Sequence, residues 1–145
     1  MSILLSLASD VVDRLMPLAA AKGLFIDMNG LPSALQGDRV LLTRLVENLI
    51  GNAIKYTNQG SIQVDVRPIG PHVTLSVTDT GIGIPNDKLE AIFQPFNRAN
   101  LEHRDGFGLG LAVVESVVKA HKGQTQITSQ VNQGTKVTIY LPTHP

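Results

Sequence analysis

The chain has 145 residues, 43% of them hydrophobic, and its 12 basic residues balance 12 acidic ones. This length and apolar content predict one domain with its own core, and the balanced charge argues against nucleic acid as a partner. The chain has no cysteine, which excludes disulfides and cysteine metal sites and fits the cytoplasm. No stretch approaches the roughly 20 apolar residues of a transmembrane helix, so we expect no membrane contact by this domain, even in a membrane-anchored parent protein.

The first 30 residues predict a helix followed by a short strand. Residues 4–21 carry apolar side chains at helical spacing, namely Leu7, Val11, Leu15 and Leu18. Pro17 predicts a kink or an early end, and Gly23 a C-terminal stop. Residues 24–28 alternate as a strand, which Asn29-Gly30 is expected to break.

Residues 38–57 predict an amphipathic helix with Asp38 as its N-cap. One arc of this helix is apolar and carries Leu42, Leu45, Val46, Leu49, Ile50 and Ala53. Asn48, Asn52 and Lys55 fall together on the other side. Asparagine is a mediocre helix former, so two of them one turn apart indicate a ligand-binding face, with a plain solvated face as the alternative.

The rest of the chain predicts two hairpins and two further helices. The strands are expected at residues 61–67, 72–78, 125–130 and 135–141, and the helices at 85–93 and 109–120. With helices on one side and mostly antiparallel strands on the other, the fold class is α+β, a two-layer sandwich. No internal repeat or interdomain linker is present.

The first glycine-rich segment, residues 79–85, follows a predicted strand and reads DTGIGIP. Its glycines allow the backbone to approach a ligand that a side chain would exclude. The carboxylate of Asp79 only accepts hydrogen bonds, which suits a donor such as the exocyclic amine of adenine. The alternative is an aspartate that opens an ordinary glycine turn.

The second glycine-rich segment, residues 106–111, leads into a predicted helix, where free backbone N–H groups and the helix dipole favour phosphate oxygens. It follows Phe93, Phe96 and a polar stretch, residues 97–105, that has the composition of a mobile loop. Cations of this loop could close over phosphates. Plain core packing is the alternative role for the two phenylalanines.

In their order and spacing, these segments resemble the ATP-binding catalytic domain of bacterial sensor histidine kinases. Residues 47–57 are similar to the family's N box, 79–85 to its first glycine box, 92–96 to its F box and 106–111 to its second glycine box. Gly134-Thr135 resembles the pair that closes the site. The resemblance implies one catalytic ATP-binding domain over residues 1–145 with a Bergerat fold, a mixed, mostly antiparallel sheet packed on three helices.

The resemblance also implies roles for individual residues. Asn52 would ligate Mg²⁺, Asn48 and Lys55 would contact the phosphates, and Asp79 would accept the adenine amine with support from Thr135. Further nucleotide contacts are expected from Tyr56, Gly81, Gly83, Ile84, Phe96, Gly106, Phe107, Gly108, Leu109, Gly110 and Leu111. Two departures concern the lid, the segment between Phe96 and Gly106 and the glycines that follow it: Phe107 stands where the family often has a small residue, and the segment between Phe96 and Gly106 is short.

The implied reaction is Mg²⁺-assisted transfer of the γ-phosphoryl group of ATP to a histidine on a separate dimerisation domain, with a response regulator as the indirect partner. None of His72, His103, His121 and His144 has the family's acceptor context, so a catalytic module excised from a larger protein is expected. Two alternatives remain. Related ATP hydrolases have a glutamate where this chain has Asn48, although Glu47 is adjacent; a non-catalytic nucleotide sensor is the third interpretation.

Overall fold

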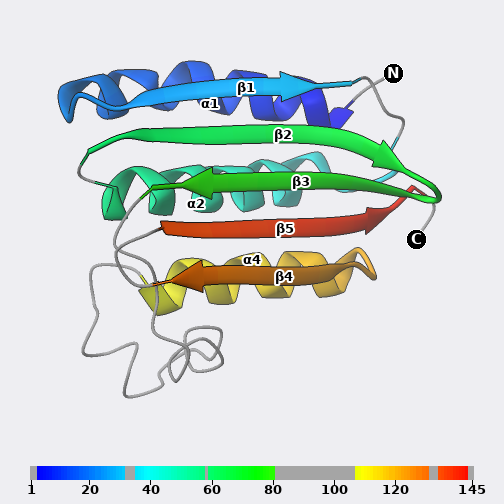
Figure 1. The fold of residues 1–145 in the computed structure, drawn as a ribbon. Helices are drawn as coiled ribbons and strands as arrows, with labels where there is room; N and C mark the ends of the chain where they lie inside the picture. Colours follow the sequence, from blue (N-terminus) through cyan, green and yellow to red (C-terminus); the bar gives the residue numbers. More distant parts are fainter. Residues whose placement is uncertain (1–2, 32–34, 58, 81–106, 131–133, 144–145) are drawn as a thin grey trace.

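The computed structural model describes residues 3–31, 35–57, 59–80, 107–130 and 134–143. These residues form three helices and five strands (Figure 1). The helices are α1 (Ile3–Ala21), α2 (Arg39–Tyr56) and α4 (Phe107–Ala120), and the strands are β1 (Phe25–Gly30), β2 (Ser61–Ile69), β3 (His72–Asp79), β4 (Gln124–Gln130) and β5 (Gly134–Pro142).

The strands form a single sheet in the order β1-β2-β3-β5-β4. β1 is parallel to β2, and every other neighbouring pair is antiparallel. The three helices lie on one face of this sheet (Figure 1). The two-layer α+β sandwich and the mixed, mostly antiparallel sheet predicted from the sequence are therefore confirmed.

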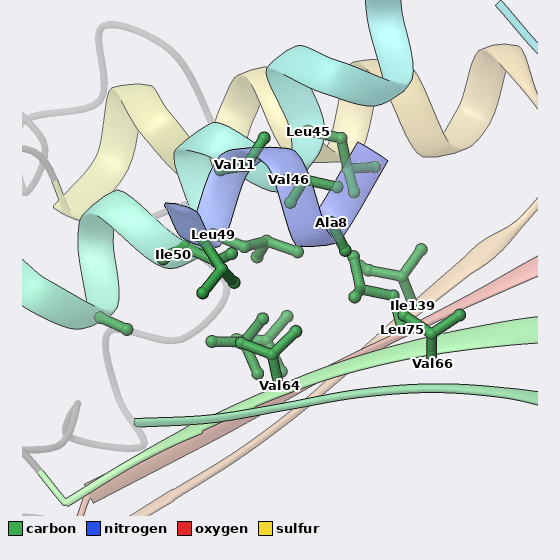
Figure 2. Close-up of a cluster of buried hydrophobic side chains, with 14 of the residues drawn as sticks. Ala8, Val11, Leu45, Val46, Leu49, Ile50, Val64, Val66, Leu75 and Ile139 are labelled. Atoms are coloured by element: carbon green, nitrogen blue, oxygen red, sulfur yellow. The ribbon is translucent and has the colours of Figure 1, made fainter. Parts of the chain in front are cut away.

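The core lies between the helices and the sheet (Figure 2). Its α2 contribution is the apolar arc expected from the sequence, and every member of that arc is buried: Leu42, Leu45, Val46, Leu49, Ile50 and Ala53. Alternate residues of β2 and β3, such as Val64, Val66 and Leu75, meet this arc from the sheet. Burial of each large aliphatic side chain contributes about 1.5–3 kcal/mol, which fixes α2 on the sheet.

Helix α1 ends at Ala21, as predicted. It continues through Pro17 instead of ending early there. A proline inside a helix costs about 3 kcal/mol, but Ala19 beyond it is fully buried in the core. Leu18, expected on the buried face, is 59% exposed. It lies in the last turn of α1, beyond Pro17.

Several other element boundaries differ from the prediction by one or two residues. β1 runs through Asn29 to Gly30, because it pairs with β2 as far as Val66. Gly30 is thus the last residue of a strand and not part of a turn, and a Cβ there would lie 3.2 Å from the Val66 carbonyl oxygen. β2 extends through Pro68. α4 begins at Phe107, two residues earlier than predicted, so its first turn contains glycines. The helix predicted at residues 85–93 lies outside the described residues.

Helices α1 and α4 end in the same hydrogen-bonded motif. In α1, the Leu24 N–H donates to the Ala19 carbonyl and the Gly23 N–H to the Ala20 carbonyl, both at 2.9 Å. Gly23 has φ +75°, the left-handed conformation that this motif requires, so the predicted stop at Gly23 is confirmed. In α4, Lys122 takes that position with φ 59°.

The buried side chain of His121 joins the end of α4 to the start of α2. Its Nε2 accepts a hydrogen bond from the Asp38 N–H at 3.0 Å, and its Nδ1 lies 2.9 Å from the Val117 carbonyl oxygen. Since Nε2 accepts, Nδ1 carries the proton and donates to Val117. Asp38 also caps α2 as predicted, with Oδ1 accepting from the Leu41 N–H at 3.0 Å.

Candidate functional site

The ends of two helices and two strands meet at one end of the sandwich, which we call the site end (Figure 1). They are the C-termini of α2 and β3, at Tyr56 and Asp79, and the N-termini of α4 and β5, at Phe107 and Gly134. The polar half of α2, the two glycine-rich segments and the Gly134-Thr135 pair all adjoin these ends. The fold thus brings together segments that are separated by up to about half of the chain.

Asp79 and Thr135 lie side by side in the register of β3 and β5. Asp79 follows buried Val73, Leu75 and Val77 at alternating positions, so its side chain is on the helix-facing side of the sheet. Its Oδ1 accepts a hydrogen bond from the Thr135 N–H at 3.2 Å. The Thr135 backbone therefore orients the carboxylate, whereas the sequence predicted support from Thr135 without specifying which group provides it.

Gly134 makes this arrangement possible. Its φ is +116°, and a Cβ on this residue would overlap the carbonyl oxygen of Asp79. No other residue type combines that backbone conformation with so close an approach. The glycine of the Gly-Thr pair is therefore required by the contact between the start of β5 and the end of β3.

The polar side of α2 carries Asn48, Asn52 and Lys55. Asn52 and Lys55 are the two of these residues nearest to the site end. Lys55 is exposed. Nδ2 of Asn52 is buried and has no hydrogen-bond partner among the described residues, and the same holds for Oγ1 of Thr57, the C-cap of α2. Buried polar atoms nearly always have a partner, so two orphaned atoms within five residues indicate a site that a ligand or water completes.

Asn48 lies one turn before Asn52, and its Nδ2 donates to the Arg44 carbonyl at 2.8 Å. The amide nitrogen is thus used within α2 itself. Its neighbour Glu47 points elsewhere: Oε2 of Glu47 lies 2.7 Å from Nη1 of Arg14 on α1. The ion pair directs the Glu47 carboxylate towards α1, although a pair this exposed adds little stability.

The sequence analysis assigned no role to two residues that contribute to the site end. Oγ1 of Thr80 accepts from the Ser61 N–H at 3.3 Å and donates to the Gln59 carbonyl at 3.1 Å. This hydroxyl joins the connection after α2 to the end of β3, directly beside Asp79. The second is Lys22, whose ammonium donates to the Ile54 carbonyl at 2.6 Å. Neither contact follows from local periodicity, because each joins distant parts of the chain.

Several predicted site residues lie outside the described part of the chain: Gly81, Gly83, Ile84, Phe96 and Gly106. Tyr56 and the segment Phe107, Gly108, Leu109, Gly110 and Leu111 are described as backbone only, in the last turn of α2 and the first turns of α4. In the described ranges, no three histidine or carboxylate side chains group as a metal site, and no helix is long and apolar enough to cross a membrane.

Comparison with known families adds the decisive observation. The model of the histidine kinase-, DNA gyrase B- and HSP90-like ATPase family matches residues 37–145, well over half of the chain. The chain belongs to this family. The resemblance to the catalytic domain of sensor histidine kinases, stated above from four sequence segments, is confirmed by the relatives of this ATPase domain and by its structural neighbours.

Sensor histidine kinase AtsR from Burkholderia thailandensis is 37% identical over 145 residues, which cover 94% of this chain and 24% of AtsR. The ATPase domain spans a quarter or less of the curated relatives it matches. Full-length ShkA in complex with AMPPNP has a TM-score of 0.80 at 29% identity, over 95% of this chain and 29% of ShkA. The catalytic domain of histidine kinase ThkA has a TM-score of 0.85 at 24% identity, over 97% and 92% of the two chains, and shows the shared fold.

Proposed function

We propose that this ATPase domain binds Mg²⁺-ATP at the site end and transfers the γ-phosphoryl group to a histidine on a separate dimerisation domain. A response regulator is the indirect partner, as the recipient of the phosphoryl group from that histidine. The observation that carries the proposal is the grouping of the Asp79 carboxylate with the orphaned amide of Asn52 at one end of the sandwich. One group suits a donor such as the adenine amine, and the other lies on the helix that also presents Lys55.

In this proposal the residues of the site bind and orient the nucleotide. The Asp79 carboxylate, which is oriented by the Thr135 N–H, accepts a hydrogen bond from the adenine amine. Lys55 neutralises phosphate charge. The contacts proposed for Tyr56 and the glycine-rich segments follow the family resemblance. Phosphoryl transfer of this kind depends on positioning and charge neutralisation, with little covalent chemistry for the protein.

The side chain of Asn52 fits a role at Mg²⁺. An amide can offer its oxygen to a cation and its N–H₂ to a phosphate oxygen, and this amide has a buried nitrogen without a partner in the described residues. Mg²⁺ keeps several waters and takes few ligands from protein, so a single amide oxygen together with phosphate oxygens is a suitable set. When bound, the ion would neutralise charge on the phosphates.

Transfer to a histidine is favoured over hydrolysis by the groups around Asn48. A hydrolase needs a base that takes a proton from water, and an amide cannot do so. Glu47, the nearest carboxylate in sequence, is paired with Arg14 on α1 at 2.7 Å. A purely nucleotide-sensing role is weakly disfavoured, because the proposed Mg²⁺ ligand and the glycines of the lid are present.

We expect Glu47→Gln to change the rate of phosphoryl transfer by less than about twofold, since an exposed ion pair contributes little and its loss leaves the site end intact. The measurement is single-turnover transfer from γ-labelled ATP to an acceptor domain. Arg14→Gln is the matched control, because it breaks the same ion pair from α1. A Glu47→Gln variant that binds ATP normally but transfers no phosphate would make Glu47 the catalytic base and refute the assignment.

The described histidines of the chain are unsuited to accept phosphate. His72 begins β3, so it lies about 23 Å from Asp79 at the site end of the same strand. His121 is 6% exposed, and both of its ring nitrogens are hydrogen-bonded. His103 and His144 lie outside the described residues.

The chain alone is therefore expected to bind Mg²⁺-ATP without labelling itself, and to label a separately supplied acceptor-histidine domain. The test is incubation with γ-labelled ATP, with and without that domain, followed by acid treatment to reveal acid-labile phosphohistidine. Label on the isolated chain that disappears in His103→Gln would contradict the proposal and make the lid histidine the acceptor.

A further inference from the structure

The proposed phosphate-binding side chains stand at the electrostatically unfavourable end of their helix. Anions bind well at helix N-termini, where the dipole is positive and N–H groups are free. Asn52 and Lys55 instead lie in the last two turns of α2, which ends at Tyr56. The carbonyls at this end carry partial negative charge, which opposes a triphosphate beside them.

Lys22, from the end of α1, contacts this helix end. Its Nζ donates to the Ile54 carbonyl at 2.6 Å and to the Lys55 carbonyl at 3.1 Å. These are two of the four last carbonyls of α2, which have no partner within a helix. A full positive charge is thus hydrogen-bonded to the groups whose partial negative charge would repel phosphates.

The position of Lys22 is fixed by the way α1 ends. Lys22 directly precedes Gly23, and the Lys22 N–H donates to the Ala19 carbonyl at 3.0 Å. The adjoining bonds from Gly23 and Leu24 close the C-terminal motif of α1. The Arg14–Glu47 ion pair also joins α1 to α2, two turns further from the site end. The ammonium is therefore held at the C-terminus of α2 by a short, ordered turn.

We propose that Lys22 is a positioning residue of the nucleotide site: it caps the C-terminus of α2, and its charge offsets the helix dipole so that this end tolerates the phosphates. The proposal rests on the proposed function, because it presumes that a nucleotide binds at the site end. Its consequence is specific: the contribution of Lys22 to affinity increases with the number of phosphates and vanishes for adenosine.

The test compares Lys22→Met with the parent chain by calorimetry, using adenosine, AMP, ADP and ATP in the presence of Mg²⁺. Methionine keeps an apolar stem of similar length but removes both the donor and the charge. ATP affinity is expected to fall about fivefold, the size of a helix-end charge effect, with a smaller loss for ADP and none for adenosine. Lys22→Arg, which restores the charge and the donors, should recover ATP affinity.

Lys119→Met is the matched control. Lys119 is a lysine in the last turn of α4, but α4 ends beside Asp38, at the end of the sandwich opposite the site. The ATP affinity of the Lys119→Met variant should therefore match that of the parent chain. Lys22→Gln keeps a donor without the charge, so it should show the same phosphate-dependent loss if charge is what matters. It also provides a second variant should Lys22→Met fail to fold.

Each outcome decides between explanations. Equal losses for adenosine and ATP would make Lys22 a structural cap only and overturn its electrostatic role. Unchanged affinity for all four ligands would overturn both roles. A parent chain that binds neither ATP nor adenosine would refute the proposed function itself, and the Lys22 proposal with it.

Discussion

Asp79→Asn is expected to weaken ATP binding about 100-fold, close to 2.7 kcal/mol by the usual conversion, while the domain remains folded. An asparagine can keep the acceptor for the Thr135 N–H, which lies 3.2 Å from Oδ1 in the parent chain. Its second group becomes an N–H₂, a donor facing the donor of the adenine amine. Loss of a hydrogen bond to a charged group, here the Asp79 carboxylate, weakens binding by about 1.5–3 kcal/mol.

Calorimetry measures this effect, and urea unfolding checks the fold. Asp65→Asn is the matched control: Asp65 is also a half-buried carboxylate in the sheet, 3.7 Å from the Arg67 guanidinium, but it lies on the face away from the helices. It should bind ATP as the parent does. If Asp79→Asn binds ATP within about threefold of the parent, Asp79 does not contact the nucleotide.

Gly134→Ala is expected to lower the free energy of unfolding by about 3 kcal/mol. The new Cβ would overlap the Asp79 carbonyl oxygen, and φ +116° is strained for alanine. The start of β5 must then move away from the end of β3, which also removes the Thr135 N–H from the Asp79 carboxylate. Any folded fraction should bind ATP weakly.

Gly70→Ala is the control for a positive φ without a close contact. Gly70 also has a positive φ, +56°, but a Cβ there would meet nothing within 4 Å. It should lose only about 1 kcal/mol, the cost of the left-handed conformation for alanine. Urea unfolding measures both variants. Equal losses in Gly134→Ala and Gly70→Ala would show that the contact with Asp79 adds nothing.

The sequence predicted helices and strands well where a local pattern decides them. The apolar arc of α2 has a helical period, and Asp38 supplies the cap, so both follow from residues close in the chain. The effect of Pro17 within α1 was predicted less well, because the cost of a proline is local while the burial of Ala19 beyond it depends on tertiary packing. The extension of β1 likewise depends on its pairing with β2.

The same distinction between local pattern and tertiary contact applies to the candidate site. Its residue types and order, and the support of Asp79 by Thr135, could be recognised by family resemblance, whereas the atoms that form each hydrogen bond could not. The Asp79–Thr135 bond spans 56 residues and requires β3 and β5 to be neighbours. The contacts of Lys22 and Thr80 also join elements that are distant in sequence. The nucleotide roles of the site residues remain predictions, and those in residues 81–106 lie outside the described structure.

The hydrogen bonds of His121 restrain the relative position of α2 and α4 at one end of the two helices. They join the end of α4 to the start of α2, at the end of the sandwich opposite the site. If this junction acts as a pivot, a change in the angle between the helices produces its largest displacement at Phe107 and Tyr56, the two helix ends farthest from it. With 14 residues in α4, a length of about 21 Å, a rotation of about 5° moves the start of α4 by about 2 Å. A small angular change at the pivot thus becomes a displacement of atomic size where the glycine-rich turn of α4 begins.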